Sequence, residues 1–152
     1  MRGIYAENTG VSTEKSKMEL ERILRRYGAE EFAQGWDSDK AVILFRMENR
    51  RIRFYLPMPD QSSICKTKTG RTRNNPAAIE QAREQATRQR WRALALAIKA
   101  KLEAVASGIT TFEEEFMAHV VMPNGQNLGA WVVPQIAEAY EKKKMPPLLG
   151  AG

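Results

Sequence analysis

The chain has 152 residues, a net charge of +6 and a pI near 9.6. This length suits a single domain, 1–152, with its own hydrophobic core, and the 43% hydrophobic content is that of a globular chain rather than a disordered one. The only cysteine, Cys65, excludes an internal disulfide and therefore a secreted, disulfide-stapled fold, and no apolar run approaches the ~20 residues of a membrane span. The basic balance favours polyanionic partners.

A first helix is expected from Thr13 to Tyr27. Its apolar residues recur at helical spacing and form one face. Ser12 is a suitable cap for its start, and Gly28 can end it in a left-handed turn. Glutamates precede arginines along the segment, which suits the helix dipole.

The strongest strand signal is Ala41 to Met58, where apolar and polar residues alternate on both sides of a turn that we expect at Asn49-Arg50. One face of this hairpin would be wholly apolar. The other would carry polar and aromatic residues: Arg46, Glu48, Arg51, Arg53 and Tyr55. In this register Arg46 lies opposite Arg53, and such a like-charge pair is unfavourable unless an anion lies over it. The pair therefore favours a nucleic-acid-binding face.

Glu31 to Trp36 predicts a further strand before the hairpin, followed by a turn at 37–39, so that the three strands form an antiparallel meander. Two positions are open for Trp36. It can lie beside Tyr55 on the outer face as a stacking platform, or it can lie in the core. The core position is favoured because an exposed tryptophan is costly.

The segment 58–75 is rich in Ser, Thr, Gly, Asn and Pro and predicts a long flexible loop. Its basic residues alternate with small polar ones: Lys66, Lys68, Arg71 and Arg73. Hydroxyls, backbone amides and basic side chains together suit phosphate contacts. A solvated loop without a ligand is the alternative.

The longest helix is expected from Pro76 to Ser107, ending at Gly108. Its apolar stripe should pack on the apolar sheet face; it comprises Trp91, Leu94, Ala95, Ile98, Leu102 and Val105. Arg88 and Arg92 flank this stripe, either as cover for the core edge or as part of a basic track. The segment Lys66 to Arg92 holds eight basic and two acidic residues, a difference equal to the net charge of the whole chain, and such concentration is typical of nucleic-acid binders.

Beyond this helix, Thr110 with Glu113 or Thr111 with Glu114 forms a capping box for a short helix. The segment 119–122 is a candidate fourth strand. A last helix from Asn127 to about Lys143 should be kinked or split by Pro134, and 145–152 forms a short tail.

Catalytic and metal-binding motifs are not found in the sequence. His119 is the only histidine, and zinc sites and nucleophilic triads need more. The phosphate-binding glycine motifs are missing too. Asp37, Asp39 and Glu48 loosely imitate the carboxylates of a nuclease, but a turn and a cross-strand pair already account for them. We expect no catalytic residues, no metal and no cofactor.

The order of elements (Thr13–Tyr27, Glu31–Met58, Pro76–Ser107) resembles that of double-stranded RNA-binding domains. Its strands followed by a long helix are similar to the core of phage single-strand annealing proteins. Where RNA-binding domains begin their second helix with lysines, this chain reads PAAIE from Pro76 to Glu80, so no site residue carries over. The stretches RQRWRALALAIKAKLEAV and GITTFEEEFMAHVVMPNGQ and the ending KMPPLL resemble uncharacterised small proteins encoded by bacteriophages and prophages. This likeness implies a phage context inside a bacterial host cell.

Together these patterns predict one α+β domain in which a three-stranded antiparallel sheet, extended to four strands if 119–122 pairs, packs on the long helix. The expected function is non-catalytic nucleic-acid binding, with single strands favoured, in the bacterial cytoplasm. The expected contacts are Arg46, Arg51, Arg53, Tyr55, Lys66, Lys68, Arg71, Arg73, Arg88 and Arg92. The alternative is an accessory protein that binds a host or phage protein, or a second copy of itself, through the acidic Glu113–Glu115 edge and the Trp131/Tyr140 face. A nuclease is a third hypothesis.

Overall fold

The computed structural model describes residues 6–7, 9–67 and 69–146. The helices are α1 (Thr13–Arg26), α2 (Gln61–Ile64), α3 (Pro76–Ala106), α4 (Phe112–Phe116), the 3-10 turn η1 (Met117–His119) and α5 (Leu128–Lys142). The strands are β1 (Glu31–Asp37), β2 (Lys40–Met47) and β3 (Arg50–Pro57). They form one antiparallel sheet in the order β1-β2-β3, which confirms the predicted α+β fold.

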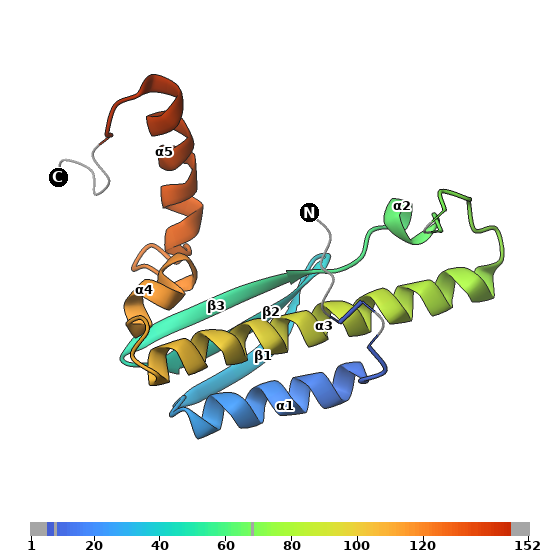
Figure 1. Cartoon of the computed structure of the whole chain (residues 1–152), viewed down its shortest axis with the longest axis horizontal. Helices are drawn as coiled ribbons and strands as arrows, with labels where there is room; N and C mark the ends of the chain where they lie inside the picture. The colour runs from blue at the N-terminus through green and yellow to red at the C-terminus, as the bar shows by residue number, and fades with distance from the viewer. Residues whose placement is uncertain (1–5, 8, 68, 147–152) are drawn as a thin grey trace.

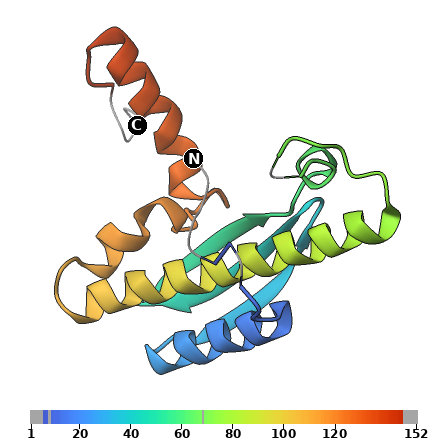
Figure 2. The ribbon, with the colours of Figure 1, turned by 45° about the vertical axis from the view of Figure 1, so that its right-hand side comes forward.

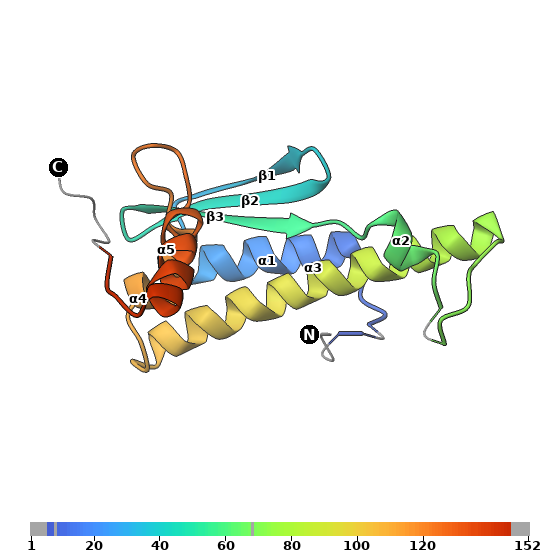
Figure 3. The ribbon, with the colours of Figure 1, turned by 90° about the horizontal axis from the view of Figure 1, so that it is seen from above.

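The fold has two layers. Helices α1 and α3 lie side by side on one face of the sheet, and the opposite face carries no helix (Figures 1 and 3). The predicted stripe of α3 faces the sheet: Trp91, Leu94, Ala95, Ile98 and Leu102 are buried. They pack with the inner residues of β2 and β3 and with Phe112 and Phe116 from α4. Helix α5 projects from the end of this body that carries α4 (Figure 2).

Local signals set most helix ends. Ser12 caps α1 by accepting a hydrogen bond from the Lys15 backbone amide, as predicted. The capping box before α4 is formed by Thr111 with Glu114, which settles the choice between the two threonines. Gly28 ends α1 with a φ of 99°, a conformation that side chains other than glycine rarely adopt.

The predicted hairpin register is wrong by two residues. The turn is formed by Glu48 and Asn49, both with left-handed φ values of 52° and 59°. Arg46 therefore lies opposite Arg51 and not opposite Arg53. A shift by two residues keeps every side chain on its predicted face, so the apolar pattern could not detect the error.

Trp36 is not in the core, since 68% of it is exposed. It does not join Tyr55 either. Trp36 pairs with the buried Ala41, and directly opposed residues share a sheet face, so Trp36 belongs to the helix-covered side. Tyr55 pairs with Val42 on the other side. Trp36 stays exposed because it lies near the end of β1, an edge strand with a neighbour on one side only.

The connection after β3 is more structured than predicted. It contains α2, which Asp60 caps, and an isolated bridge between Lys66 and Thr72. The candidate fourth strand is reduced to a bridge of Val120 with Ile52 on β3. Helix α5 runs through Pro134 as one helix, so the predicted split is wrong.

Candidate nucleic-acid interface

The uncovered face of the sheet is ordered in rows by strand pairing. One row runs from Ala33 through Leu44 to Arg53, and the next from Gly35 through Val42 to Tyr55. The small residues Ala33 and Gly35 are exposed, and the two aliphatic side chains between the outer strands are half-buried. The result is a shallow apolar floor with cationic and aromatic residues on its β3 side. The alternation of β2 already predicts Val42 and Leu44 on this face, but only its polar and aromatic residues were named as candidates.

Tyr55 is the aromatic centre of this face, with 38% of its surface exposed. The ammonium of Lys40 lies 4.5 Å from the centre of its ring and the guanidinium of Arg53 lies 5.3 Å from it. Lys40, which the sequence interpretation missed, comes from the start of the neighbouring strand. An exposed aromatic ring with cations close to it is the combination with which single-strand binders stack bases and contact phosphates.

A hollow of about 470 Å³ lies beside this ring, between β3 and the first turn of α5. It is lined by Arg53, Tyr55, Ala118, His119, Gly125, Gln126, Asn127, Gly129 and Ala130. The sheet platform therefore continues into a concave surface at the β3 edge.

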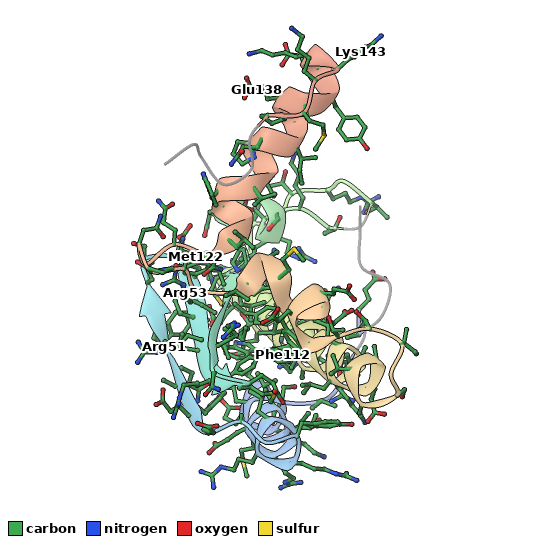
Figure 4. The ribbon with its side chains drawn as sticks, turned by 90° about the vertical axis from the view of Figure 1, so that its left-hand side faces the viewer. Arg51, Arg53, Phe112, Met122, Glu138 and Lys143 are labelled. Carbon is green, nitrogen blue, oxygen red and sulfur yellow. The ribbon has the colours of Figure 1, made fainter. Side chains whose placement is uncertain are left out.

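Arg53 is held in place by the segment that precedes α5. Its Nε donates a hydrogen bond of 3.0 Å to Asn127 Oδ1, and its Nη2 donates one of 2.6 Å to the carbonyl oxygen of Gly125. These neutral acceptors leave the guanidinium charge uncompensated. Arg51 is exposed and points outward from the sheet (Figure 4), and within the described part of the chain its side chain has no hydrogen-bond or ion-pair partner.

Arg46 is occupied internally. Its guanidinium contacts the carboxylates of Glu30, at 2.7 Å, and Glu31, at 3.1 Å. Arg46 still faces another arginine, Arg51, but these two carboxylates compensate the pair without an external anion. The like-charge argument from the sequence therefore does not point to nucleic acid, and Arg46 is a weak candidate for phosphate contact.

The predicted loop residues gather in a second place. Lys66 and Arg73 line a groove of about 880 Å³ between the α2 segment and the first half of α3. Arg73 donates hydrogen bonds of 2.6 Å to the carbonyl oxygens of Ile64 and Lys66 and so closes the loop. Arg71 is exposed, and Lys68 lies outside the described residues.

Arg88 and Arg92 do not extend a track on the sheet. Arg92 forms an ion pair of 2.5 Å with Glu19 on α1, and Arg88 donates hydrogen bonds to Gln85 on its own helix. These contacts place both on the helical layer, where Arg92 ties α3 to α1. The expectation that they cover the core edge agrees with their half-buried side chains. They do not lie on the sheet face that carries Tyr55.

No family model matches this chain, and the comparisons with curated proteins and with solved structures find no match. Among the residues that the structure describes, no helix is long and apolar enough to cross a membrane. Within the same residues, no three His, Cys, Asp or Glu side chains are grouped so that they could hold a metal ion.

His119 lines the hollow and stacks on Phe54, with ring centres 3.9 Å apart. Burial lowers the pKa of this imidazole, and the nearby ammonium of Lys101 lowers it further, against a hydrogen bond to the Arg53 backbone that raises it. His119 is therefore neutral at pH 7. A neutral ring packed on a core phenylalanine explains it as a structural residue.

Proposed function

We propose that this chain is a non-catalytic nucleic-acid-binding protein that takes single strands on the uncovered face of its sheet. The observation that carries the proposal is the exposed Tyr55 ring with Lys40 and Arg53 close to it, beside the hollow at the β3 edge. Single-strand binders combine such stacking rings with cations that follow the backbone. A phage-encoded origin and a bacterial cytoplasmic setting remain predictions that fit this function.

The contact set proposed here is narrower than the sequence suggested. Tyr55 would stack one base, Lys40 and Arg53 would contact the adjoining phosphates, and Arg51 would contact a phosphate further along β3. Lys66 and Arg71 could add contacts only with a strand that continues past the end of the sheet. Arg46 and Arg92 are left out because carboxylates compensate their charges, and Arg88 is left out because it lies on the helical layer.

The first test is fluorescence anisotropy with labelled single-stranded DNA, duplex DNA and RNA, at about 50 and 200 mM salt. Single-strand binding that weakens steeply with salt supports the proposal. Absence of binding at the lower salt concentration contradicts it, and preferential duplex binding contradicts the role of Tyr55 as a stacking platform.

Two substitutions then locate the site. Tyr55→Ala should weaken single-strand binding by about 1–3 kcal/mol, or about 5- to 150-fold in Kd. Its matched control is Trp36→Ala, since Trp36 is an exposed aromatic residue on the opposite face of the same sheet. Arg51→Ala should reduce the slope of log K against log salt by about 0.7, whereas Arg22→Ala on α1 should not. Equal losses in Tyr55→Ala and Trp36→Ala would exclude the proposed face.

A second candidate function is protein binding through α5. No residue of α5 is buried, and it exposes several large apolar side chains: Trp131, Val133, Ile136 and Tyr140. The acidic edge named with this alternative is less available, because Glu113 pairs with Arg50 and Glu115 with Lys101.

A further inference from the structure

Arg53 has one edge of its guanidinium free. Its Nε and Nη2 donate hydrogen bonds to Asn127 Oδ1 and to the Gly125 carbonyl oxygen, at the foot of α5 (Figure 4). These two nitrogens form one edge of the planar fork, and Nη1 and Nη2 form the next. Nη1 has no hydrogen-bond or ion-pair partner in the described part of the chain. The second edge is therefore open to a ligand, and the two bonds on the first edge hold it in a fixed orientation.

The hollow beside Arg53 is suited to a flat ring. It measures about 470 Å³, and volumes of about 300–1,000 Å³ are typical of sites for small organic molecules. Ala118, Gly129 and Ala130 line it with no side chain longer than a methyl group, so a ring can approach the backbone there. Among the described residues that line the hollow, none carries a carboxylate, so nothing acidic competes for the free donors of Arg53.

Two other side chains of the hollow supply hydrogen-bond acceptors. The Gln126 side chain is exposed, and its amide has no partner within residues 6–7, 9–67 and 69–146. One ring nitrogen of His119 donates to the Arg53 backbone, and because the ring is neutral at pH 7, its other nitrogen is an acceptor. The hollow thus offers two adjacent donors on Arg53 and two separate acceptors.

We propose that this hollow binds a base of the single strand and prefers guanine. Guanine presents two neighbouring acceptors, O6 and N7, and an arginine binds this pair with two parallel hydrogen bonds. The N1–H and N2–H groups of guanine can donate to Gln126 and His119. Adenine carries an amino group in place of O6 and would direct a donor at the donors of Arg53. Cytosine and thymine lack the O6/N7 pair.

This inference rests on the proposed function and names the base that the sheet face selects. Arg53 and Tyr55 both line the hollow and lie two residues apart on the same face of β3, or about 7 Å along the strand. A base in the hollow and a base stacked on Tyr55 can therefore be neighbours in one strand. In this narrower assignment Lys40 contacts the phosphate beside Tyr55, and the free edge of Arg53 serves the base.

The test is fluorescence anisotropy with labelled single strands of about eight nucleotides, within the usual site sizes, as DNA and as RNA. One strand is all thymidine (uridine in RNA), and three others carry a single central guanine, adenine or cytosine. The guanine strand should bind about 5- to 150-fold more tightly than the others. Equal affinities, or preference for another base, overturn the inference and leave the sheet-face proposal standing. No binding of any strand contradicts the proposed function and the inference with it.

Two variants, each verified by circular dichroism to be folded, locate the preference. Arg53→Lys should weaken binding of all strands and abolish the difference between them, because an ammonium keeps the charge but presents no planar fork. Ala130→Leu fills part of the hollow and should reduce the affinity for the guanine strand to that for the others. Its matched control is Ala137→Leu, at an exposed site two turns further along α5, which should keep the preference. A guanine preference that survives both Arg53→Lys and Ala130→Leu overturns the inference.

Discussion

Arg53 and Asn127 exchange two hydrogen bonds across the edge of the sheet. Arg53 Nε donates to Asn127 Oδ1 at 3.0 Å, and Asn127 Nδ2 donates to the Arg53 carbonyl oxygen at 2.9 Å. Asn127 occupies the cap position of α5, yet its side chain makes no capping bond. The asparagine therefore serves to dock α5 on β3 rather than to start the helix. The same pair fixes the guanidinium beside Tyr55.

Asn127→Ala should lower the free energy of unfolding by about 1–3 kcal/mol, because it removes both hydrogen bonds of the pair and leaves the half-buried Arg53 with only the Gly125 carbonyl oxygen as its acceptor. It should also raise amide hydrogen exchange in α5 more than in α1. Urea denaturation and exchange measured by mass spectrometry would check this. The matched control is Asn74→Ala, an exposed asparagine, which should change neither. Unaltered exchange in α5 would mean that the pair does not anchor the helix.

Gly129 allows the first turn of α5 to approach η1 closely. A Cβ at this position would lie 2.9 Å from the Ala118 carbonyl oxygen and 3.1 Å from the Ala118 Cβ. Gly129→Ala should therefore destabilise the fold by about 1–3 kcal/mol, although alanine is the better helix former. Gly35→Ala is the control, since a Cβ there meets nothing within 4 Å. Thermal unfolding of both variants compares them directly, and a stabilised Gly129→Ala would show that α5 can shift without cost.

The sheet faces were predictable because alternation at period two assigns each residue of the hairpin to a side. The register was not, since moving the turn from Asn49-Arg50 to Glu48-Asn49 leaves both faces intact. Ala41 lies opposite Leu56 in the observed register and would have lain opposite Met58 in the predicted one, so the apolar pattern accepts both. The long helix and its buried stripe were predictable because its apolar residues recur at helical spacing, and both are confirmed.

The candidate site was less predictable, because the charge of an arginine does not reveal which carboxylate it pairs with in the fold. Arg46 and Arg92 count as cations in the sequence, but only the fold shows that Glu31 and Glu19 compensate them. The exposure of Trp36 depends on its position on an edge strand. Residues far apart in sequence decide each of these contacts, and local patterns do not contain them.

Ser16 provides a test of the contact between α1 and the core. Its side chain is fully buried, and its hydroxyl has no hydrogen-bond partner among the residues that the structure describes. Ser16→Ala should leave stability unchanged or raise it by up to about 1 kcal/mol, since it removes a desolvated polar group. Leu20→Ala, one turn further along the same buried face, should cost about 2–5 kcal/mol. Urea midpoints of the two variants give the comparison. A loss above about 1 kcal/mol in Ser16→Ala would reveal a partner for the hydroxyl, such as an ordered water.

His119 should make the fold sensitive to mild acid. Burial lowers the pKa of its imidazole below the ordinary value of 6.5, with a further contribution from Lys101. Below about pH 6.5 the unfolded chain therefore binds a proton that the folded chain does not. The free energy of unfolding should fall as the pH decreases from about 6.5, and the fall should stop once the folded imidazole is protonated too. Urea denaturation at intervals between about pH 7.5 and 5 measures this.

The variant that isolates this effect is His119→Phe, because a phenyl ring keeps the stacking on Phe54 and cannot titrate. It loses the hydrogen bond to the Arg53 backbone, so its stability at pH 7.5 should be lower. Its stability should nevertheless change less than that of the unmodified protein between about pH 6.5 and 5, because His119 is the only histidine. Parallel curves for the two proteins would show that the folded imidazole titrates as it does in the unfolded chain. A folded His119 that accepts a proton freely would be open to solvent. The hollow beside Arg53 and Tyr55 would then admit more water than the stacking of His119 on Phe54 indicates.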